Sequence, residues 1–279
     1  ATEAVVREAS LPCYVRLRQF PKIGYIAVRH ELTPSLRGDV LISMNDDVLP
    51  EPGFVEAHRA SAELFGDEAA FVGYSPFAPV PSPSVIDRLA AVTPWVFFYD
   101  RMLAEPEADR DWGFRHLFGL NFSARLDRVR DCGGWTAMPD VYGYDDIELG
   151  HRLAASGLAI RFLPEAVATH DHRMSADDLL RREEALGHAA AWYASRRPEF
   201  ARDVFGRDIL ADGAIAECES NAPAAVELES FRALAGVPGD HADPFAVLER
   251  YRPLKRAVWA RGLLRGVASL READQRRAA

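Results

Sequence analysis

LISMNDDVLP, residues 41–50, joins a short apolar run to three polar residues and a turn. Val40–Met44 is typical of a buried strand of a parallel sheet, because its side chains are almost continuously apolar. The strand is expected to end there, so that Asn45, Asp46 and Asp47 follow its carboxyl end. In open α/β sheets, ligands bind at that edge. Oxygen ligands in this position favour a hard cation such as Mg²⁺ or Mn²⁺ that carries substrate phosphates.

A second acidic cluster, GYDDIELGHRL, begins at Gly143 and opens an expected helix. Asp145, Asp146 and Glu148 fall in its first turn, where the helix dipole favours negative charge, so capping alone could explain them. The preceding segment, residues 133–144, is rich in glycine and aromatic residues and is typical of a loop that shapes a site. One of the acids could therefore act as a general base toward a hydroxyl.

Two histidines follow the second acidic cluster. His170 ends a run expected to be a strand, Ala166–His170, and His172 comes two residues later. If the strand continues, both side chains point to the same side of it. His170 is a candidate metal ligand, and a purely structural histidine is the alternative.

The composition and the order of elements indicate the fold class. The chain has 279 residues, of which 48% are hydrophobic, so it can bury a sizeable core. Strands alternate with helices, which predicts an α/β domain with a mainly parallel, Rossmann-like sheet flanked by helices over residues 1–205. After that point the sequence becomes helical, and residues 206–279 are expected to form a C-terminal helical extension.

Charge and cysteine content narrow the function classes. The net charge of −9 argues against general nucleic-acid binding. The three cysteines are scattered and form no CxxC pair, which fits a reducing compartment and predicts a cytoplasmic protein. No apolar stretch approaches the ~20 residues needed to span a bilayer.

The C-terminal segment is basic, with a net charge of +6 from Tyr251 onward, which leaves −15 for the rest of the chain. An apolar stripe at helical spacing is formed by Trp259, Leu263, Val267 and Leu270. Arg261 and Arg265 lie on the opposite face. Two interpretations are open: the stripe packs against the catalytic domain, or the basic helix makes a peripheral membrane contact near a lipid-linked acceptor.

Four segments in this order and spacing resemble family 2-like glycosyltransferases with the GT-A fold. They are LISMNDDVLPEPGF, GLNFSARLDRVRDCGGW, YGYDDIELGHRL and ATHDH. The resemblance covers roughly residues 21–200, and the joint pattern is specific although each piece alone is not.

The resemblance implies a role for each residue of the first cluster and for the histidines. The first cluster corresponds to the DXD-type motif, in which Asp47 falls on the position that binds the metal. Asn45 and Asp46 fall on positions beside the nucleotide, and Asn45 is suited to contact ribose or a metal-bound water. His170 corresponds to the late metal-ligating histidine of the family, with His172 as the alternative.

The resemblance also implies roles around the second cluster. Asp146 falls on the catalytic base of the ED motif, and Asp145 stands where the family usually has Glu. Gly133 and Gly134 correspond to a glycine pair that lets the donor sugar approach the backbone, and Trp135 to an aromatic residue that faces the acceptor. The arginine of the motif corresponds to Arg152, whose alternative role is an ion pair on the helix face.

The implied activity is a metal-dependent transfer of a sugar, with inversion, from a nucleotide-diphosphate donor. Mn²⁺ or Mg²⁺ would assist, and the acceptor would be a carbohydrate, a lipid-linked molecule or a small molecule. The family's usual first β-α-β unit, which holds the nucleotide base, is expected to be missing from residues 1–205. Two alternatives are a degenerate, non-catalytic binding protein and a glycoside hydrolase, which also uses two carboxylates.

Overall fold

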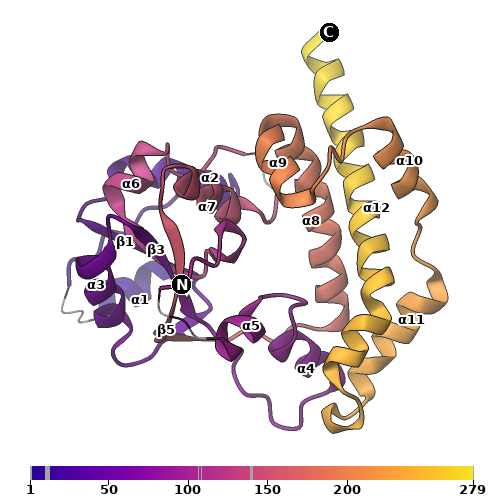
Figure 1. Ribbon diagram of the computed structural model, residues 1–279, viewed down its shortest axis with the longest axis horizontal. Coiled ribbons are helices and arrows are strands. Elements are labelled where there is room, and N and C mark those ends of the chain that lie inside the picture. Colours follow the sequence, from indigo (N-terminus) through magenta and orange to yellow (C-terminus); the bar gives the residue numbers. More distant parts are fainter. Residues whose placement is uncertain (1, 10–12, 106, 108, 139–140, 279) are drawn as a thin grey trace.

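The computed structural model describes residues 2–9, 13–105, 107, 109–138 and 141–278. A single β-sheet with helices around it forms one half of the molecule, and two long helices lie side by side in the other half (Figure 1). This arrangement confirms the predicted α/β class with a C-terminal helical extension.

The sheet is mixed. Its strands are β1 (Val40–Met44), β2 (Val48–Pro50), β3 (Ala69–Tyr74), β4 (Asn121–Arg125) and β5 (Ala159–His170), in the spatial order β1-β4-β3-β5-β2. Only β3 and β5 pair in parallel, while the pairs β1–β4, β3–β4 and β2–β5 are antiparallel. Because β1 and β3 are both antiparallel to β4, the strands β1, β3 and β5 share one direction. The predicted parallel strands therefore exist, but β4 lies antiparallel between two of them.

The described residues form twelve α-helices. They are α1 (Thr2–Glu8), α2 (Tyr25–Leu32), α3 (Phe54–Phe65), α4 (Val85–Val92), α5 (Tyr99–Ala104), α6 (Leu126–Asp131), α7 (Asp145–Ala155), α8 (Ala176–Arg196), α9 (Pro198–Phe205), α10 (Asp212–Ser220), α11 (Ala225–Ala233) and α12 (Pro244–Ala278). Short 3₁₀ helices are η1 (Thr33–Ser35), η2 (Phe114–His116), η3 (Leu234–Gly236) and η4 (Gly239–His241). Reciprocal capping boxes begin α4 at Ser84 and α8 at Ser175, which explains why both starts are sharp.

Two segments differ from their expected secondary structure. An alternating segment, Cys13–Leu17, favours a strand by its sequence but forms none, and Tyr14 is 89% exposed, so no face of it is buried. The sequence of Phe114–Ala124 is also expected to form a strand, yet pairing begins only at Asn121. Before that point the Gly119 carbonyl accepts a hydrogen bond from Ser43 Oγ at 2.9 Å, which holds this backbone at the end of the sheet.

Helices α8 and α12 approach each other closely because glycines lie at their contact. A Cβ on Gly187 would lie 1.9 Å from the Trp259 carbonyl oxygen, and a Cβ on Gly262 equally close to the Glu184 carbonyl oxygen. Such distances are incompatible with any side chain, so the glycines set the separation of the two helices.

The apolar stripe predicted on the C-terminal helix packs inside the protein. Leu263 is 1% exposed, and Val267 and Leu270 pack against the same cluster of buried residues from α8, α9 and α12. Arg261 and Arg265 bind the Glu184 carboxylate of α8 at 2.6 and 2.5 Å. The interpretation that the stripe packs against the rest of the protein is therefore correct. The apolar side chains that a membrane contact would need are used in this packing. Within the described residues, no helix is both long and apolar enough to cross a bilayer.

The predicted boundary near residue 205 falls at the end of α9, where Gly206 adopts a left-handed φ of 71°. The helices beyond it share a hydrophobic cluster with α8, through Cys218 of α10 and Ala260 of α12. The C-terminal extension is consequently in a position to contribute side chains to a site next to α8.

Candidate functional site

The first acidic cluster lies at the end of β1, as the sequence predicts. The chain turns at Asn45–Asp47 and returns as β2, which pairs with the end of β5 so that Val48 faces His170. This pairing brings Asp47 next to both histidines: its Oδ2 lies 3.3 Å from His170 Nε2 and 3.8 Å from His172 Nδ1. The two imidazole rings stack, with centroids 5.5 Å apart. Residues separated by more than a hundred positions therefore meet through strand pairing.

The second cluster lies at the start of α7. Tyr144 precedes the helix with a left-handed φ of 62°, an uncommon conformation for a residue with a side chain. Asp146 accepts two backbone hydrogen bonds, from Gly119 N–H to Oδ2 and from Ile147 N–H to Oδ1, each at 2.8 Å. These donors fix the carboxylate where the loop before β4 meets the helix.

Asp145 is held differently from its neighbour. It is 4% exposed, accepts a hydrogen bond from the Tyr25 hydroxyl at 2.8 Å, and forms an ion pair with Arg29 at 3.0 Å. The same Arg29 guanidinium donates to Asn45 Oδ1 at 2.9 Å. Arg29 of α2 thus links the two acidic clusters directly.

The environment of Asp146 shifts its titration toward neutrality. Burial, followed by the nearby Asp145 carboxylate, raises the pKa of Asp146 to about 6 from an ordinary 3.8, against the lowering effect of its backbone donors. A general base works best when its pKa lies near the operating pH. The geometry thus gives Asp146 the character of a base that is ionised, but not strongly stabilised, at neutral pH.

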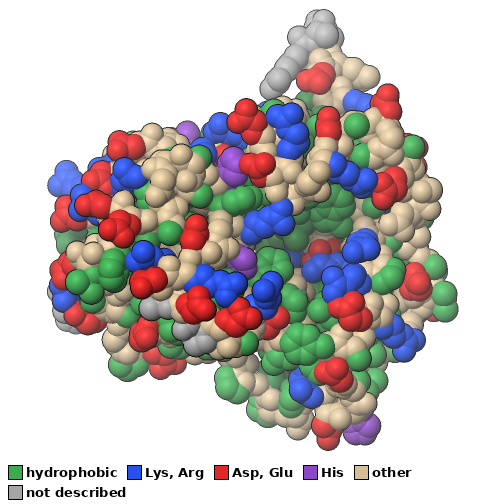
Figure 2. All heavy atoms as spheres, in the orientation of Figure 1, with side chains coloured by type: hydrophobic (Ala, Val, Ile, Leu, Met, Phe, Trp, Pro, Cys, Tyr) green, Lys and Arg blue, Asp and Glu red, His purple; other side chains and the backbone are tan. Residues whose placement is uncertain are grey.

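One cavity contains both clusters and both histidines. It has a volume of about 780 Å³, within the range of ligand pockets. Its wall includes Asn45, Asp46, Asp47, Asp145, Asp146, His170, His172 and, from the helical half, Arg182, Glu183 and Lys255. Figure 2 shows a hollow in the middle of the molecule, with hydrophobic side chains in its depth and Lys and Arg side chains around it.

The residues around Asp47 suit a divalent cation. Asp47 Oδ1 and His170 Nδ1 are buried without a hydrogen-bond partner in the described structure, and imidazole nitrogen with carboxylate oxygen is a donor set that Mn²⁺ accepts. Among the residues that the structure describes, no three His, Cys, Asp or Glu side chains are arranged as a closed metal site. Asp47 with His170 or His172 would therefore be an open set, which substrate oxygens complete.

Three residues expected near the substrate lie elsewhere. Gly133 and Gly134 end α6 with left-handed φ values of 90° and 65°, and a Cβ on Gly134 would lie 2.8 Å from the Thr33 side chain. Trp135 is 3% exposed and packs on Phe122 in the core. The glycines are needed here for helix termination and close packing, and none of the three lines the cavity.

Arg152 and Glu148 form a structural ion pair. The guanidinium binds both carboxylate oxygens of Glu148, at 2.9 and 2.8 Å, and Glu148 also accepts from Thr136 Oγ1 at 2.9 Å. Glu148 is 1% exposed, so this pair fixes α7 against the preceding loop. Pro139 and Asp140 of that loop lie outside the described residues.

Many residues of the cavity were not predicted from the sequence, among them Tyr25, Arg29, Gly119, Arg182 and Lys255. Tyr25 and Arg29 are four residues apart on α2, so both point to the same face, but this spacing is common on helices. Arg182 and Lys255 gave no signal of their own, because each stands among other charged residues of its helix, in LLRREE and in RPLKR.

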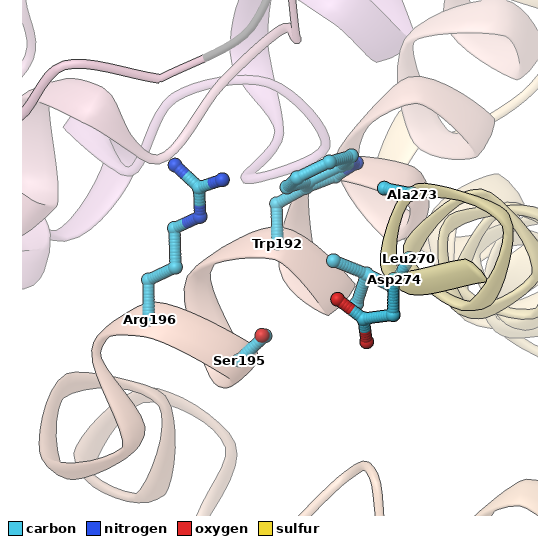
Figure 3. A pocket seen from close by; sticks show the side chains of 6 residues that line it. All are labelled: Trp192, Ser195, Arg196, Leu270, Ala273 and Asp274. Carbon is cyan, nitrogen blue, oxygen red and sulfur yellow. The ribbon is translucent and has the colours of Figure 1, made fainter. Parts of the chain in front are cut away.

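A second hollow, of about 460 Å³, lies between the C-terminal parts of α8 and α12 (Figure 3). Trp192, Ser195 and Arg196 line it from α8, and Leu270, Ala273 and Asp274 from α12. The indole of Trp192 lies toward α12, with the Arg196 guanidinium 5.1 Å from its ring. Its described lining includes one carboxylate and no histidine, whereas the larger cavity is lined by Asp47, Asp145, Asp146 and both histidines.

Comparison with known proteins gives a limited match in sequence. No protein-family profile matches the chain. Over 75 residues it is 33% identical to a protein described as pre-mycofactocin glycosyltransferase from two strains of Mycobacterium tuberculosis, CDC 1551 / Oshkosh and ATCC 25618 / H37Rv. The match covers 27% of this chain and 16% of those proteins, so it spans about a sixth of their length.

Two solved structures that align with this chain are described as follows. The mannosyltransferase PcManGT from Pyrobaculum calidifontis, in complex with GDP-Man and Mn²⁺, aligns with a TM-score of 0.48 at 15% identity, over 88% of this chain and 66% of that one. GalNAc-T7 with UDP, GalNAc and Mn²⁺ aligns with a TM-score of 0.42 at 15% identity, over 84% of this chain and 46% of that one.

Proposed function

We propose that this chain is a glycosyltransferase, which moves a sugar from a nucleotide-diphosphate donor to an acceptor hydroxyl. The observation that carries the proposal is the meeting of Asp146 with Asp47, His170 and His172 in one cavity of about 780 Å³. The motif resemblance and the 33% identity over 75 residues to a described glycosyltransferase support it. Three cysteines without a disulfide fit the proposed cytoplasmic location.

Asp146 is the proposed base. Its Oδ1 and Oδ2 are held by the N–H groups of Ile147 and Gly119, so one carboxylate lone pair on each oxygen remains for a substrate hydroxyl. The carboxylate accepts the proton of the acceptor hydroxyl while that oxygen attacks the anomeric carbon, and the bond from this carbon to the nucleoside diphosphate breaks so that the diphosphate leaves. One direct displacement of this kind inverts the configuration of the sugar.

Asp47 with His170 or His172 would hold Mn²⁺ or Mg²⁺. When bound, the cation supplies positive charge that stabilises a diphosphate leaving group. Asn45 and Asp46 are exposed beside these residues and are proposed to contact the nucleotide. Asp145 is 4% exposed and forms an ion pair with Arg29, so we assign it a positioning role toward Asp146 rather than direct proton transfer.

The experiment compares wild type with Asp146→Asn and a control, Asp67→Asn, whose carboxylate is 85% exposed. Release of nucleoside diphosphate from a panel of UDP- and GDP-sugars is measured with Mn²⁺. Loss of a general base lowers turnover by roughly 10²–10⁴-fold, so this loss is expected for Asp146→Asn and no change for the control. Full activity of Asp146→Asn would refute the assignment of the base.

Removal of the metal tests the second part of the proposal. EDTA is expected to abolish transfer by wild type, and added Mn²⁺ to restore it. Release of free sugar that is insensitive to EDTA would instead indicate a glycoside hydrolase. If calorimetry detects no binding of any nucleotide sugar in the panel, the chain is a non-catalytic relative.

A further inference from the structure

The helical side of the cavity carries a group of charged residues, one buried and two partly buried, that the proposed reaction does not use. Arg182 and Glu183 follow each other on α8, and Lys255 comes from α12. The Glu183 carboxylate lies 3.0 Å from the Arg182 guanidinium and 3.6 Å from the Lys255 ammonium. Its side chain is 3% exposed, whereas those of Arg182 and Lys255 are 17% and 25% exposed. Two cations thus share one carboxylate in the cavity wall.

Both cations are held in place by backbone carbonyls of the segment between α4 and α5. Lys255 Nζ donates to the Trp95 carbonyl at 2.7 Å, and Arg182 Nη2 donates to the Val96 carbonyl at 3.3 Å. The Lys255 ammonium also lies 5.1 Å from the Trp95 ring. These contacts fix the two charged groups before any ligand arrives, which reduces the entropy cost of binding.

Arg182 and Lys255 together carry one positive charge more than Glu183 neutralises, and partial burial makes this excess charge unfavourable. Burial is the largest influence on Lys255 and lowers the pKa of its ammonium group, against the opposing effect of Glu183. An anion placed between the two cations would compensate the excess charge, and hydrogen bonds between charged groups are the strong ones. The acidic residues that follow β1 and begin α7 thus lie on one side of the cavity, and the two cations that share Glu183 lie on α8 and α12.

We propose that Arg182 and Lys255 form an anion-binding position for a carboxylate or phosphate group carried by the acceptor. This assignment rests on the proposed function, in which the Asp47 side of the cavity receives the donor diphosphate. It gives the C-terminal extension a role in choosing the acceptor, since α12 supplies Lys255.

The first experiment titrates inorganic phosphate into the protein in EDTA and measures binding by calorimetry. Lys255→Met keeps most of the length of the side chain and removes its charge, and it is expected to weaken phosphate binding at least tenfold. Arg252→Met on the same helix removes an exposed charge that pairs with Glu249, and it should leave the affinity within twofold. Arg182→Gln provides a second variant in case Lys255→Met does not fold. Equal phosphate affinity in wild type and both cavity variants would overturn the proposal.

The second experiment separates acceptor from donor by titrating UDP and GDP with Mn²⁺. If the anion belongs to the acceptor, Lys255→Met keeps its nucleotide affinity within twofold of wild type. A tenfold loss parallel to that of phosphate would assign the cations to the donor diphosphate and overturn the acceptor assignment. If neither nucleotide binds wild type, the proposed function fails, whereas the phosphate titration in EDTA still decides whether the anion position exists.

Discussion

The free energy of unfolding of Asp146→Asn minus that of wild type is expected to be larger at pH 7 than at pH 5. The pKa of this carboxyl is raised to about 6 from 3.8, first by burial and then by the Asp145 carboxylate. A raised pKa in the folded state means that folding favours the protonated form. The contribution to stability is fully present below pH 3.8 and is lost as the pH rises through about 6. Asn has no charge to bury, so the variant does not show this loss.

The size of the effect follows from the shift. One pKa unit corresponds to about 1.36 kcal/mol, so the complete titration of Asp146 amounts to about 3 kcal/mol. About 1 kcal/mol of that falls between pH 5 and pH 7, because at pH 5 the carboxyl is already ionised in the unfolded chain and mostly protonated in the folded protein. The variant also loses one acceptor for the Gly119 and Ile147 N–H donors, but this cost is the same at every pH.

Urea unfolding at pH 5, 6 and 7, at constant ionic strength and in EDTA, measures the difference. The free energy of unfolding of Asp146→Asn minus that of wild type should grow by about 1 kcal/mol across this range. The same difference for Asp67→Asn, an exposed carboxylate, should stay constant. A constant difference for Asp146→Asn would show that its pKa is not raised, and the argument for a base poised near neutrality would fail with it.

Three further predictions concern helix packing and Arg29. Gly187→Ala, whose Cβ would lie 1.9 Å from a carbonyl of α12, should destabilise the protein by roughly 1–3 kcal/mol in urea unfolding. Gly213→Ala on α10 meets no atom within 4 Å and should not destabilise; equal losses would contradict the close helix contact. Arg29→Met should lower the free energy of unfolding by about 3 kcal/mol, because it leaves the buried Asp145 carboxylate without its ion-pair partner. A double-mutant cycle with Asp145→Asn should give a coupling energy above ~1 kcal/mol, and additive effects of the two substitutions would refute the ion pair. Because Arg29 lowers the pKa of Asp146, Arg29→Met should also move the pH–rate midpoint upward, and a downward shift would contradict this influence.

Much of the fold and the acidic part of the site could be predicted because their signals are local. The apolar run before Asn45 ends in polar residues, and β1 ends there. The acids of Asp145–Ala155 and the Ser175 capping box mark helix starts through interactions within a few residues. The position of His170 could also be predicted from a local signal, because this residue ends an apolar run that forms the last part of β5.

The rest depends on contacts that the local pattern does not encode. The sequence of β4 is compatible with either strand direction, so its antiparallel position between β1 and β3 follows only from the assembled sheet. Arg29 contacts Asp145 across 116 positions, and Lys255 contacts the Trp95 carbonyl across 160. Conversely, Trp135 resembles a residue that faces an acceptor, but the termination of α6 at Gly133 and Gly134 turns it into the core.

Two adjacent carboxylates at the start of α7 acquire different properties because of helix geometry. Successive residues of an α-helix project about 100° apart, so Asp145 and Asp146 cannot share the same partners. Asp145 faces the hydroxyl and guanidinium of α2, whereas Asp146 faces the Gly119 N–H group at the end of the sheet. The charge of the first then raises the pKa of the second, and Arg29 limits that rise. A single helix start can therefore supply both a carboxylate held in an ion pair and a base with a raised pKa, and Arg29, which limits that rise, is a residue that no motif identifies.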